Sequence, residues 1–590
     1  MAGNNNRKKR ESIIKRLLHD MGSDRKKLLL VIVIVGAAKL LLSVAPTVSG
    51  NITDRIVVFA NTGSFDMKWL AGMCILLAAM YLLGNGADIL VGNLMMGISQ
   101  GIVRKLRDAG QKKFNRLPIK YIDSHPTGDI LSRLTNDMQA LNTSIESTLS
   151  VLLGQFLLLL GVLVMMFITN PLFTLVYIVV LPLGFLASSF IMKLSIRLVR
   201  EQSKLTGRIT SIASDSFSNY SMIKAYGCEK EKTDAFNKVN REFYKKYSKA
   251  QFFAGFIMPI SVIVSNLAYI IECIVGGLFL INGKLTLGEF QAFLIYGNMV
   301  LSPLTALSTA VNSIQTGLIS AKRIYEFLDE EEEPDESAKP DLDTSGTKGQ
   351  ISFDHVRFGY VPEKQLMTDV SLQTKAGQTI AIVGPTGAGK TTLINLLMRF
   401  YDIDGGKISL DGADINSLSR NSLRQAFGIV LQDSWIFDGT VEENIAYGKK
   451  NAAHEDVLRA TGLTHCDKFI EKLDDGYDTH ISDEKAQLSS GEKQLLSIAR
   501  TLVADPPILI LDEATSQVDT RTELIITEAM EKLMEGRTCF VIAHRLFTIK
   551  NADTIIYMED GDIKEVGSHD ELMKLDGRYS KLFRQASDHV

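Results

Sequence analysis

The chain has 590 residues, too many for one hydrophobic core, so at least two domains are expected. Its 64 Lys and Arg against 67 Asp and Glu give a formal net charge of −3, which argues against a nucleic-acid-binding protein with a basic face. The 5 cysteines are odd in number, which excludes a complete disulfide framework. They are scattered without the spacing of a metal site, so free thiols are expected.

Residues 1–27 form a basic, polar segment without the apolar region and cleavage site of a signal peptide. Within this segment, one face of a short helix would be apolar. The residues on that face are Ile13, Ile14, Leu17, Leu18 and Met21. Lys15 and Arg16 would lie on the opposite face. The pattern is typical of a helix in the membrane interface, and a frayed polar tail is the alternative that stays open.

Residues 28–328 contain apolar stretches of which most reach the roughly 20 residues that a membrane-spanning helix needs. The six stretches lie near 28–49, 69–97, 148–168, 172–192, 252–281 and 289–310. Lys and Arg are frequent before the first stretch and in the loops 98–147 and 193–250, and they are rare in the loops between. This alternation predicts a six-helix transmembrane domain with both termini in the cytoplasm.

The two inner connections are too long to be simple turns. Arg200, Lys204 and Arg208 recur at helical spacing in the second one, and proline is nearly absent. We therefore expect the membrane helices to continue as long helical extensions into the cytosol.

Three ionisable residues, Lys39, Asp88 and Glu272, fall within the apolar stretches. Charges at membrane depth are unfavourable unless they face a partner or a wet cavity. Lys39 and Glu272 are therefore candidates for a translocation cavity. The alternative, which stays open, is that these residues are interfacial because the helices extend beyond the lipid.

Residues 329–349 are acidic, contain two prolines and lack apolar periodicity, which predicts an interdomain linker. From residue 350 to residue 590, short strand-like runs alternate with helical patterns, which predicts an α/β domain.

The apolar run 380–383 is followed by a glycine-rich loop that opens a helix, the context of the GxxxxGK[ST] phosphate-binding motif. The loop residues are Gly384, Pro385, Thr386, Gly387, Ala388, Gly389, Lys390, Thr391 and Thr392. The glycines let backbone N–H groups approach phosphate oxygens at the start of a helix. Lys390 would reach the β- and γ-phosphates, and the Thr391 hydroxyl would bind Mg²⁺.

A second apolar run, 508–511, ends in Asp512 and Glu513, and a third, 540–543, is followed by His544. The carboxyl ends of strands in an open α/β sheet are where ligands bind. Asp512 suits Mg²⁺, and Glu513 suits the polarisation of an attacking water, so Glu513 and His544 are the catalytic candidates.

With these motifs the chain resembles a half-transporter of the ABC exporter family over nearly its whole length. The loop 384–392 corresponds to the Walker A motif and residues 510–513 to Walker B. The resemblance implies that Tyr360 stacks on adenine and that Gln432 contacts Mg²⁺ and signals to the membrane domain. It also implies that 516–519, ending in Asp519, is the D-loop and that His544 is the switch histidine.

The resemblance further implies two coupling regions at the tips of the cytosolic extensions, near 119–125 and 214–222. In this family, two nucleotide domains close head to tail around two ATP molecules. Each site joins the Walker motifs of one subunit to the signature motif of the other, so a half-transporter must dimerise.

The signature position departs from the family pattern, because it reads LSSGE where LSGGQ is usual. Its residues after Leu488 are Ser489, Ser490, Gly491 and Glu492. Ser490 replaces a glycine, and Glu492 adds a negative charge near the expected phosphate. With Glu513 intact, the chain is similar to the intact-Walker-B subunit of heterodimeric bacterial multidrug exporters, which implies a second ABC half-transporter as its partner.

The function implied is ATP-hydrolysis-driven export of small amphipathic molecules, drugs or lipids, across the plasma membrane by alternating access. ATP and Mg²⁺ are the cofactors, membrane lipid surrounds the helices, and no nucleic acid is involved. A lipid flippase, a peptide exporter, a siderophore importer on the same fold and a homodimeric exporter remain alternatives. An ATP-regulated channel is disfavoured by Glu513 and His544.

Overall fold

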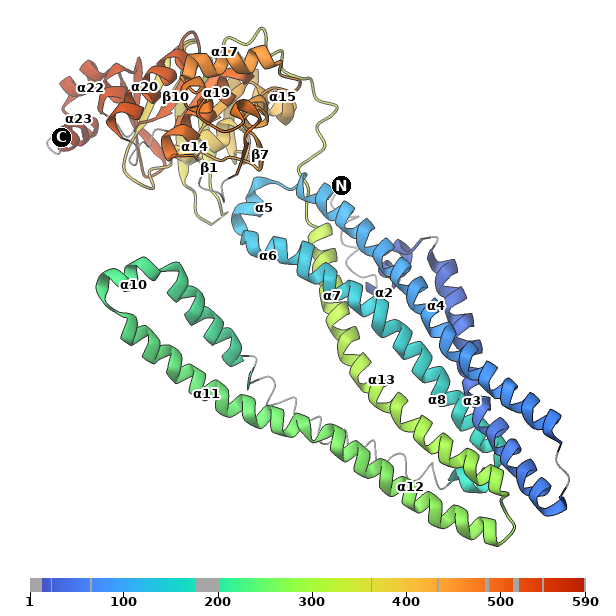
Figure 1. The fold of residues 1–590 in the computed structure, drawn as a ribbon. Helices are drawn as coiled ribbons and strands as arrows, with labels where there is room; N and C mark the ends of the chain where they lie inside the picture. Colours follow the sequence, from blue (N-terminus) through green and yellow to red (C-terminus); the bar gives the residue numbers. More distant parts are fainter. Residues whose placement is uncertain are drawn as a thin grey trace. The chain divides into compact units, whose positions relative to one another are not determined.

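The computed structural model describes residues 13–22, 24–63, 66–175, 201–202, 204–361, 363–431, 434–482, 488–512, 519–543 and 546–587. The chain divides into two compact units (Figure 1). The first is formed by the residues up to Asn115 together with Pro126–Glu330, and the second by Arg116–His125 together with the residues from Glu331 onward. The segment Arg116–His125 therefore packs with the second unit, although helices of the first unit precede and follow it in the sequence.

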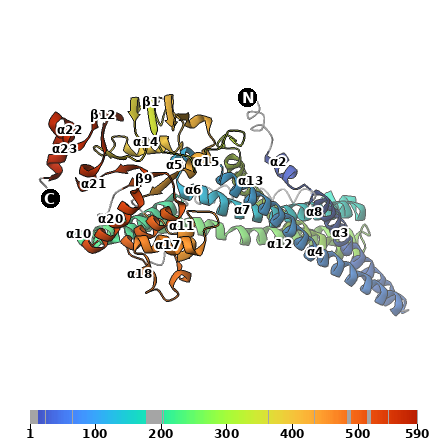
Figure 2. The same cartoon turned by 90° about the horizontal axis from the view of Figure 1, so that it is seen from above.

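The first unit is helical throughout its described elements, as the sequence predicts. These elements are α2 (Ile13–Asp20), α3 (Asp24–Thr62), α4 (Met67–Phe114), α6 (Thr127–Ser132), the π-helical turn η1 (Arg133–Asp137), α7 (Met138–Thr143), the π-helical turn η2 (Ser144–Thr148), α8 (Leu149–Thr169), α10 (Tyr220–Tyr226), α11 (Glu229–Gly255), α12 (Ile257–Ile281) and α13 (Leu287–Leu328). Figure 2 shows α11 and α12 following one another along one long rod.

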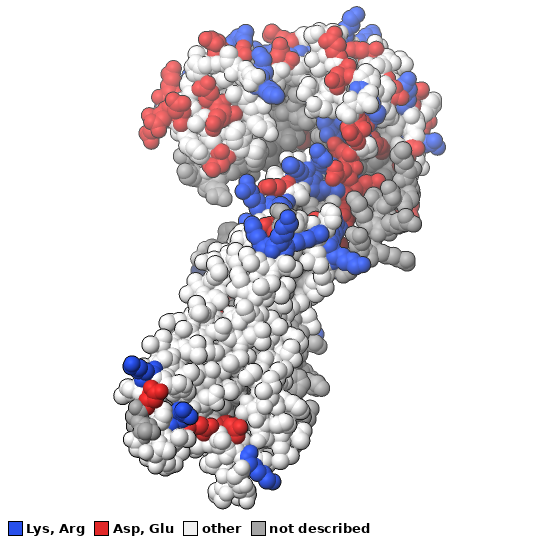
Figure 3. Space-filling model, turned by 90° about the vertical axis from the view of Figure 1, so that its right-hand side faces the viewer, with Lys and Arg blue, Asp and Glu red and all other residues white. Residues whose placement is uncertain are grey.

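Among the described residues, three helical runs are long and apolar enough to cross a membrane, namely α3, α4 and the run Thr127–Thr169. The predicted stretches 28–49 and 69–97 fall within α3 and α4, and the last one, 289–310, falls within α13. The predicted stretch 172–192 lies mainly outside the described residues. Figure 3 shows a wide band without Lys, Arg, Asp or Glu on one face of the helical unit, with charged residues at the lower end of this face. Such an uncharged band is what a lipid-facing surface requires.

The long inner connections are helical where they are described. α4 continues to Phe114, and α11 alone has 27 residues, which at about 1.5 Å per residue makes it roughly 40 Å long. The predicted helical extensions are thus confirmed for these segments.

The N-terminal helix α2 forms, but its apolar residues do not share one environment. Ile13 and Leu17 pack against the core of the helical unit, whereas Ile14 and Leu18 are exposed. Arg16, expected on the outer polar face, instead forms two hydrogen bonds to Asp329, of 2.5 and 2.7 Å. The helix is therefore anchored by its polar side as well as its apolar side, which the helical periodicity alone did not indicate.

In the part of the second unit that the structure describes there are three sheets. They are six-stranded (β12-β11-β3-β10-β9-β6), four-stranded (β2-β1-β4-β5) and two-stranded (β7-β8). The strands are β1 (Ile351–Phe358), β2 (Met367–Gln373), β3 (Thr379–Val383), β4 (Gly405–Leu410), β5 (Ala413–Asp414), β6 (Phe427–Val430), β7 (Gly439–Thr440), β8 (His480–Ile481), β9 (Ile508–Asp512), β10 (Thr538–Ile542), β11 (Thr554–Glu559) and β12 (Asp562–Gly567). The predicted runs 380–383, 508–511 and 540–543 coincide with β3, β9 and β10 to within two residues.

The helical elements of the second unit surround these sheets. They are α5 (Ile119–Ser124), α14 (Lys390–Leu397), the 3₁₀ turn η3 (Ile415–Ser417), α15 (Arg420–Gln425), α16 (Val441–Ala446), α17 (His454–Thr464), α18 (Asp467–Ile470), the 3₁₀ turn η4 (Gly476–Asp478), α19 (Ser490–Ala504), α20 (Thr520–Met534), α21 (Leu546–Asn551), α22 (His569–Leu575) and α23 (Arg578–Ser587).

The central strand β3 is buried on both faces. Ile380 and Ile382 pack into one hydrophobic core, and Ala381 and Val383 pack into the other. This alternation explains why the strand reads as an unbroken apolar run. It also fixes the strand that carries the phosphate-binding loop between two rigid layers.

Candidate functional site

Three parallel strands bring the predicted motifs to one edge of the six-stranded sheet. Ile542 of β10 pairs with Ile382 of β3 on one side and with Asp512 of β9 on the other. The loop after β3, the end of β9 and the end of β10 therefore lie together, as predicted. Glu513 and His544 follow directly in sequence but lie outside the described residues.

The glycines of the loop are required by its geometry. A Cβ atom at Gly384 would lie 2.1 Å from the carbonyl oxygen of Met558. Gly389 has a φ of 98° and is the N-cap of α14, and no side chain caps this helix. The first N–H groups of α14 are therefore left for an external acceptor, which makes this helix start suitable for a phosphate group.

Lys390 is held over the same loop. Its Nζ donates hydrogen bonds of 2.7 Å to the Gly384 carbonyl and 3.1 Å to the Pro385 carbonyl. Burial lowers the pKa of the Lys390 ammonium, and the negative charge of Asp512 opposes that shift. Carbonyl oxygens that hold the ammonium can be exchanged for phosphate oxygens without moving the lysine backbone.

Tyr360 connects the loop helix to neighbouring aromatic rings. Its hydroxyl lies 3.0 Å from Thr392 Oγ1. Its ring meets those of Phe358 and Tyr401 edge to face, with centroids 5.0 Å away in each case. The Tyr360 ring remains partly exposed, so an aromatic surface is available beside the phosphate-binding loop for a base to stack on.

The same edge offers oxygen ligands that suit Mg²⁺. Thr391 is exposed in the first turn of α14, and Asp512 ends β9. A hydroxyl and a carboxylate are the hard donors that Mg²⁺ prefers, so these residues fit the ion. Gln432, the third predicted ligand, lies outside the described residues.

The signature residues form a reciprocal capping box at the start of α19. The Glu492 carboxylate accepts hydrogen bonds from the backbone N–H and the hydroxyl of Ser489, each 2.8 Å long. The Ser489 hydroxyl in turn accepts from the Glu492 N–H. The added charge of Glu492 is thus bound to donors that a phosphate would otherwise use. The pattern S-x-x-E is visible in the sequence and was missed there.

Asp519, the described residue of the predicted D-loop, is the N-cap of α20. Its carboxylate accepts 3.1 Å hydrogen bonds from the backbone N–H groups of Arg521 and Thr522. Hydrogen bonds from Thr522 and Arg521 hold the pKa of Asp519 below its usual value, so the cap is ionised at neutral pH. Residues 516–518 lie outside the described residues.

In the helical unit, Lys39 and Asp88 form an ion pair that sequence reasoning did not predict. Lys39 Nζ lies 2.8 and 2.9 Å from the two carboxylate oxygens of Asp88. The Lys39 side chain is 9% exposed and that of Asp88 is 50% exposed. Glu272 is also buried. The cavity role of Lys39 and Glu272 stays a prediction.

The predicted first coupling region contains the short helix α5, and it contacts a residue that sequence reasoning missed. Tyr401 donates a 2.6 Å hydrogen bond to Asp123 of α5. The only signal in the sequence was an aromatic residue shortly after the phosphate-binding helix.

Comparison with protein families matches residues 28–304 to the transmembrane region of ABC transporters and residues 367–516 to the ABC transporter domain. The chain is 41% identical over 491 residues to a fatty acid ABC transporter ATP-binding/permease protein of Mycobacterium bovis, which covers 83% of this chain and 77% of the relative. It is 36% identical over 487 residues to an ATP-dependent lipid A-core flippase of Desulfotalea psychrophila, with coverage of 82% and 85%.

Among solved structures, the fold is similar to that of a bacterial Atm1-family ABC exporter with ATP bound. The TM-score is 0.74 at 30% identity, and the match covers 95% of this chain and 98% of the other.

Proposed function

The chain belongs to the ABC transporter family with the architecture of an exporter half-transporter, and from this premise we propose how its residues drive ATP-dependent export. Exporters of this family work as dimers. We propose that ATP closes two nucleotide domains, that the segments near 119–125 and 214–222 relay this closure, and that the membrane helices then open outward. Hydrolysis resets them.

The hydrolytic chemistry is assigned to the sheet edge. Lys390 and the N–H groups of the loop 384–389 would neutralise the phosphates, and Glu513 would polarise the attacking water. His544 would bind the γ-phosphate, and this contact would be lost when the phosphate leaves. Thr391, Gln432 and Asp512 would hold Mg²⁺, which spreads the phosphate charge. Phosphoryl transfer depends mainly on positioning and charge stabilisation, so these groups suffice.

The observation that carries this assignment is the uncapped start of α14 after a loop in which Gly384 has no room for a side chain and Gly387 and Gly389 have positive φ. The test is Glu513→Gln, which should reduce hydrolysis by about a thousandfold while ATP binding persists. A variant that keeps most of its turnover would overturn the role of Glu513.

We propose that the partner is a different half-transporter. The negative charge of Glu492 supports this, because its carboxylate binds the donors of Ser489. A helix start neutralised in this way is a poor phosphate site, so the site built on this signature would turn over slowly. The efficient site would combine the Walker motifs of this chain with the partner's signature.

Expression with and without a candidate partner half-transporter tests the pairing. This chain alone should show little ATPase activity, and co-expression should restore activity and yield a complex with one copy of each chain. Full ATPase activity and transport from this chain alone would establish the homodimeric alternative.

For cargo, we propose anionic amphipathic molecules with acyl chains. Support comes from the two relatives named for fatty acid and lipid A-core transport, and from Lys39, a buried cation within an apolar helix. An anionic headgroup would compete with Asp88 for Lys39. Substrate-stimulated ATPase activity in liposomes, with fatty acids compared against cationic dyes, would distinguish this proposal from drug export.

A further inference from the structure

The interdomain segment that follows α13 has no helix or strand in residues 331–349, yet it is bound to the second unit along much of its length. The Glu333 side chain binds Arg424 at 2.9 Å, and the Glu333 N–H donates to the Arg116 carbonyl at 2.9 Å. Further along, Lys339 donates to the Asn416 carbonyl at 2.7 Å. The segment is thus a strap, not a free tether.

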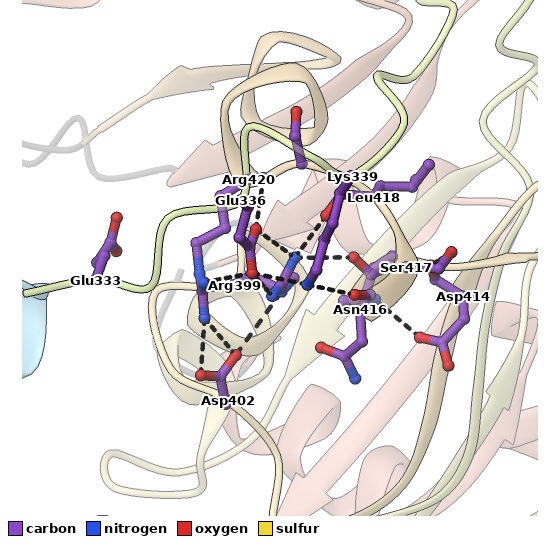
Figure 4. Close-up of polar contacts among 12 residues, drawn as sticks. Glu333, Glu336, Lys339, Arg399, Asp402, Asp414, Asn416, Ser417, Leu418 and Arg420 are labelled. Carbon is purple, nitrogen blue, oxygen red and sulfur yellow. Dashed lines mark hydrogen bonds and ion pairs between the residues drawn. The ribbon is translucent and has the colours of Figure 1, made fainter. Parts of the chain in front are cut away.

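Glu336 is an acidic residue of this strap whose side chain is enclosed. Its Oε1 lies 2.8 Å from Arg399, 2.6 Å from Arg420 and 2.8 Å from Lys339 (Figure 4). Its side chain is 9% exposed, and that of Arg399 is 4% exposed. Burial alone would raise the pKa of Glu336, but hydrogen bonds from Lys339 and Arg399 and the charges of both arginines outweigh it and lower the pKa to about 2.

Ionised Glu336 supplies the carboxylate that Arg399, Arg420 and Lys339 share, and these cations lose that partner when it is neutral. Arg420 also forms two 2.8 Å hydrogen bonds to Asp402, whose side chain is largely exposed. Without the Glu336 carboxylate, two poorly solvated guanidinium groups would face each other with one exposed counter-charge between them. Uncompensated buried charge is strongly destabilising, so the arginines would have to move.

Moving Arg399 would disturb the turn that follows α14. Arg399 has a φ of 50°, an unfavourable left-handed conformation for a residue with a side chain. Its guanidinium donates 3.0 Å hydrogen bonds to the carbonyls of Ile415 and Leu418, which hold it inside. The ion pair with Glu336 therefore helps to keep the backbone at 399 turned, and the next residues depend on that turn.

Tyr401, two residues later, is where this turn meets the coupling segment. It donates to Asp123 of α5 at 2.6 Å, and its ring lies against that of Tyr360, whose hydroxyl is 3.0 Å from Thr392. Contacts thus run from α5 through Tyr401 and Tyr360 to the phosphate-binding helix. The path ends at two helices, α5 and α14, and the turn that contains Tyr401 joins them.

We propose that Glu336 is a positioning residue for transmission, which by holding Arg399 and Arg420 keeps Tyr401 in contact with both the coupling segment α5 and the adenine-side aromatic Tyr360. The strap that joins the domains thereby sets how strongly nucleotide binding moves the membrane helices. This inference rests on the transport cycle proposed above.

The test uses the full transporter in liposomes and compares Glu336→Gln with Glu331→Gln. The control makes the same chemical change in the same strap at an exposed side chain. The readout is hydrogen–deuterium exchange in peptides covering 50–62 at the outer end of α3, measured without nucleotide and after trapping with Mg-ATP and vanadate. ATP affinity and basal ATPase activity are measured in parallel.

For Glu336→Gln we expect the nucleotide-induced change in exchange to fall about threefold or more, while ATP affinity stays within about twofold of wild type. Glu331→Gln should behave as wild type. Tyr401→Phe, which removes the hydrogen bond to Asp123, should reproduce the loss. The double variant should lose no more than the larger single loss, since both changes act on one path.

Three results would overturn the inference. They are a wild-type response in Glu336→Gln, a wild-type response in Tyr401→Phe, and additive losses in the double variant, which would give Glu336 an independent structural role. If Glu336→Gln does not fold, Glu336→Asp takes its place, because it keeps the negative charge and shortens the side chain by one methylene group. Absence of any nucleotide response in the wild type would instead contradict the proposed transport cycle.

Discussion

Two helix starts in the ATP-binding domain differ in one respect that separates their chemistry. α14 begins at Gly389, in a left-handed conformation and without a side-chain cap, whereas α19 begins at Ser489 inside a capping box with Glu492. Both present backbone N–H groups at their first turn. The first leaves its donors for a ligand, whereas at the second the N–H groups of Ser489 and Glu492 are satisfied within the chain. At α14 the missing side-chain cap leaves the helix start open to a phosphate group.

The box at α19 is of the same kind as boxes elsewhere in this domain. Thr440 with Glu443 opens α16 in this way, and Ser568 with Glu571 opens α22. Neither helix belongs to the proposed ATP site. By this comparison the signature helix of the chain has an ordinary capped start. Glutamine at position 492 would also suit such a box, so the negative charge of Glu492, and not the box itself, supports unequal ATP sites in the dimer.

Among the helix starts, the largest effect is expected at the open one. Lys390→Met removes the ammonium that lies over the loop carbonyls, so the phosphates lose their main neutralising charge. ATPase activity should fall by about a hundredfold or more. Steady-state hydrolysis and nucleotide binding by the complex measure this loss. Lys375→Met, at an exposed position outside the loop, should leave both unchanged, and a Lys390→Met variant with normal activity would contradict the phosphate-site assignment.

A smaller and opposite effect is expected at the capped helix start. Glu492→Gln removes the negative charge and keeps a side chain that suits the third position of a capping box. ATP affinity and turnover at the site completed by this signature should rise about three- to tenfold, because the repulsion with phosphate is removed. Stability should change little, because glutamine can make the same capping contact. The measurement is ATPase activity of the complex whose efficient site is blocked by Glu513→Gln.

Glu571→Gln is the matched control for this change, since it alters an equivalent box at α22. It should reproduce the small stability change without any effect on ATP affinity. If Glu492→Gln and Glu571→Gln leave ATP turnover equally unaffected, the carboxylate of Glu492 is not what weakens the signature.

The smallest effect is expected at α20, whose start is capped by Asp519 alone. Asp519→Ala removes the cap and should lower the Tm of the complex by about 2 °C, whereas Asp519→Asn should keep it near wild type. Because the pKa of Asp519 is lowered in the folded chain, its contribution is complete at neutral pH and is lost only as the pH falls below about 4. Thermal unfolding at pH 7 checks the order of the two variants, and equal losses would show that Asp519 does not act as a cap.

Much of the ATP-binding domain could be predicted because its signals are local. The run 380–383 and the loop after it specify a buried strand, a tight turn and a helix start within a dozen residues. The cap formed by Glu492 is equally local, because its spacing to Ser489 is that of a capping box.

Other features join residues that are far apart in the chain. Lys39 and Asp88 lie on different helices, and their pairing depends on how α3 packs against α4. From its sequence the strap is predicted to be a free acidic linker. Residues 329–349 contain no signal that Glu336 will pair with Arg399 and Arg420, which are 63 and 84 residues away in the chain.

The sequence by itself determined the chemistry of the chain, since apolar length, phosphate-loop spacing and strand ends are properties of neighbouring residues. Only the tertiary structure decided which charges meet. Three contacts follow from the packing of whole elements, namely those of Glu336 with Arg399, of Lys39 with Asp88 and of Tyr401 with Asp123. Hydrophobic burial drives that packing and is non-directional, so the sequence of neighbouring residues does not specify which distant charges come together.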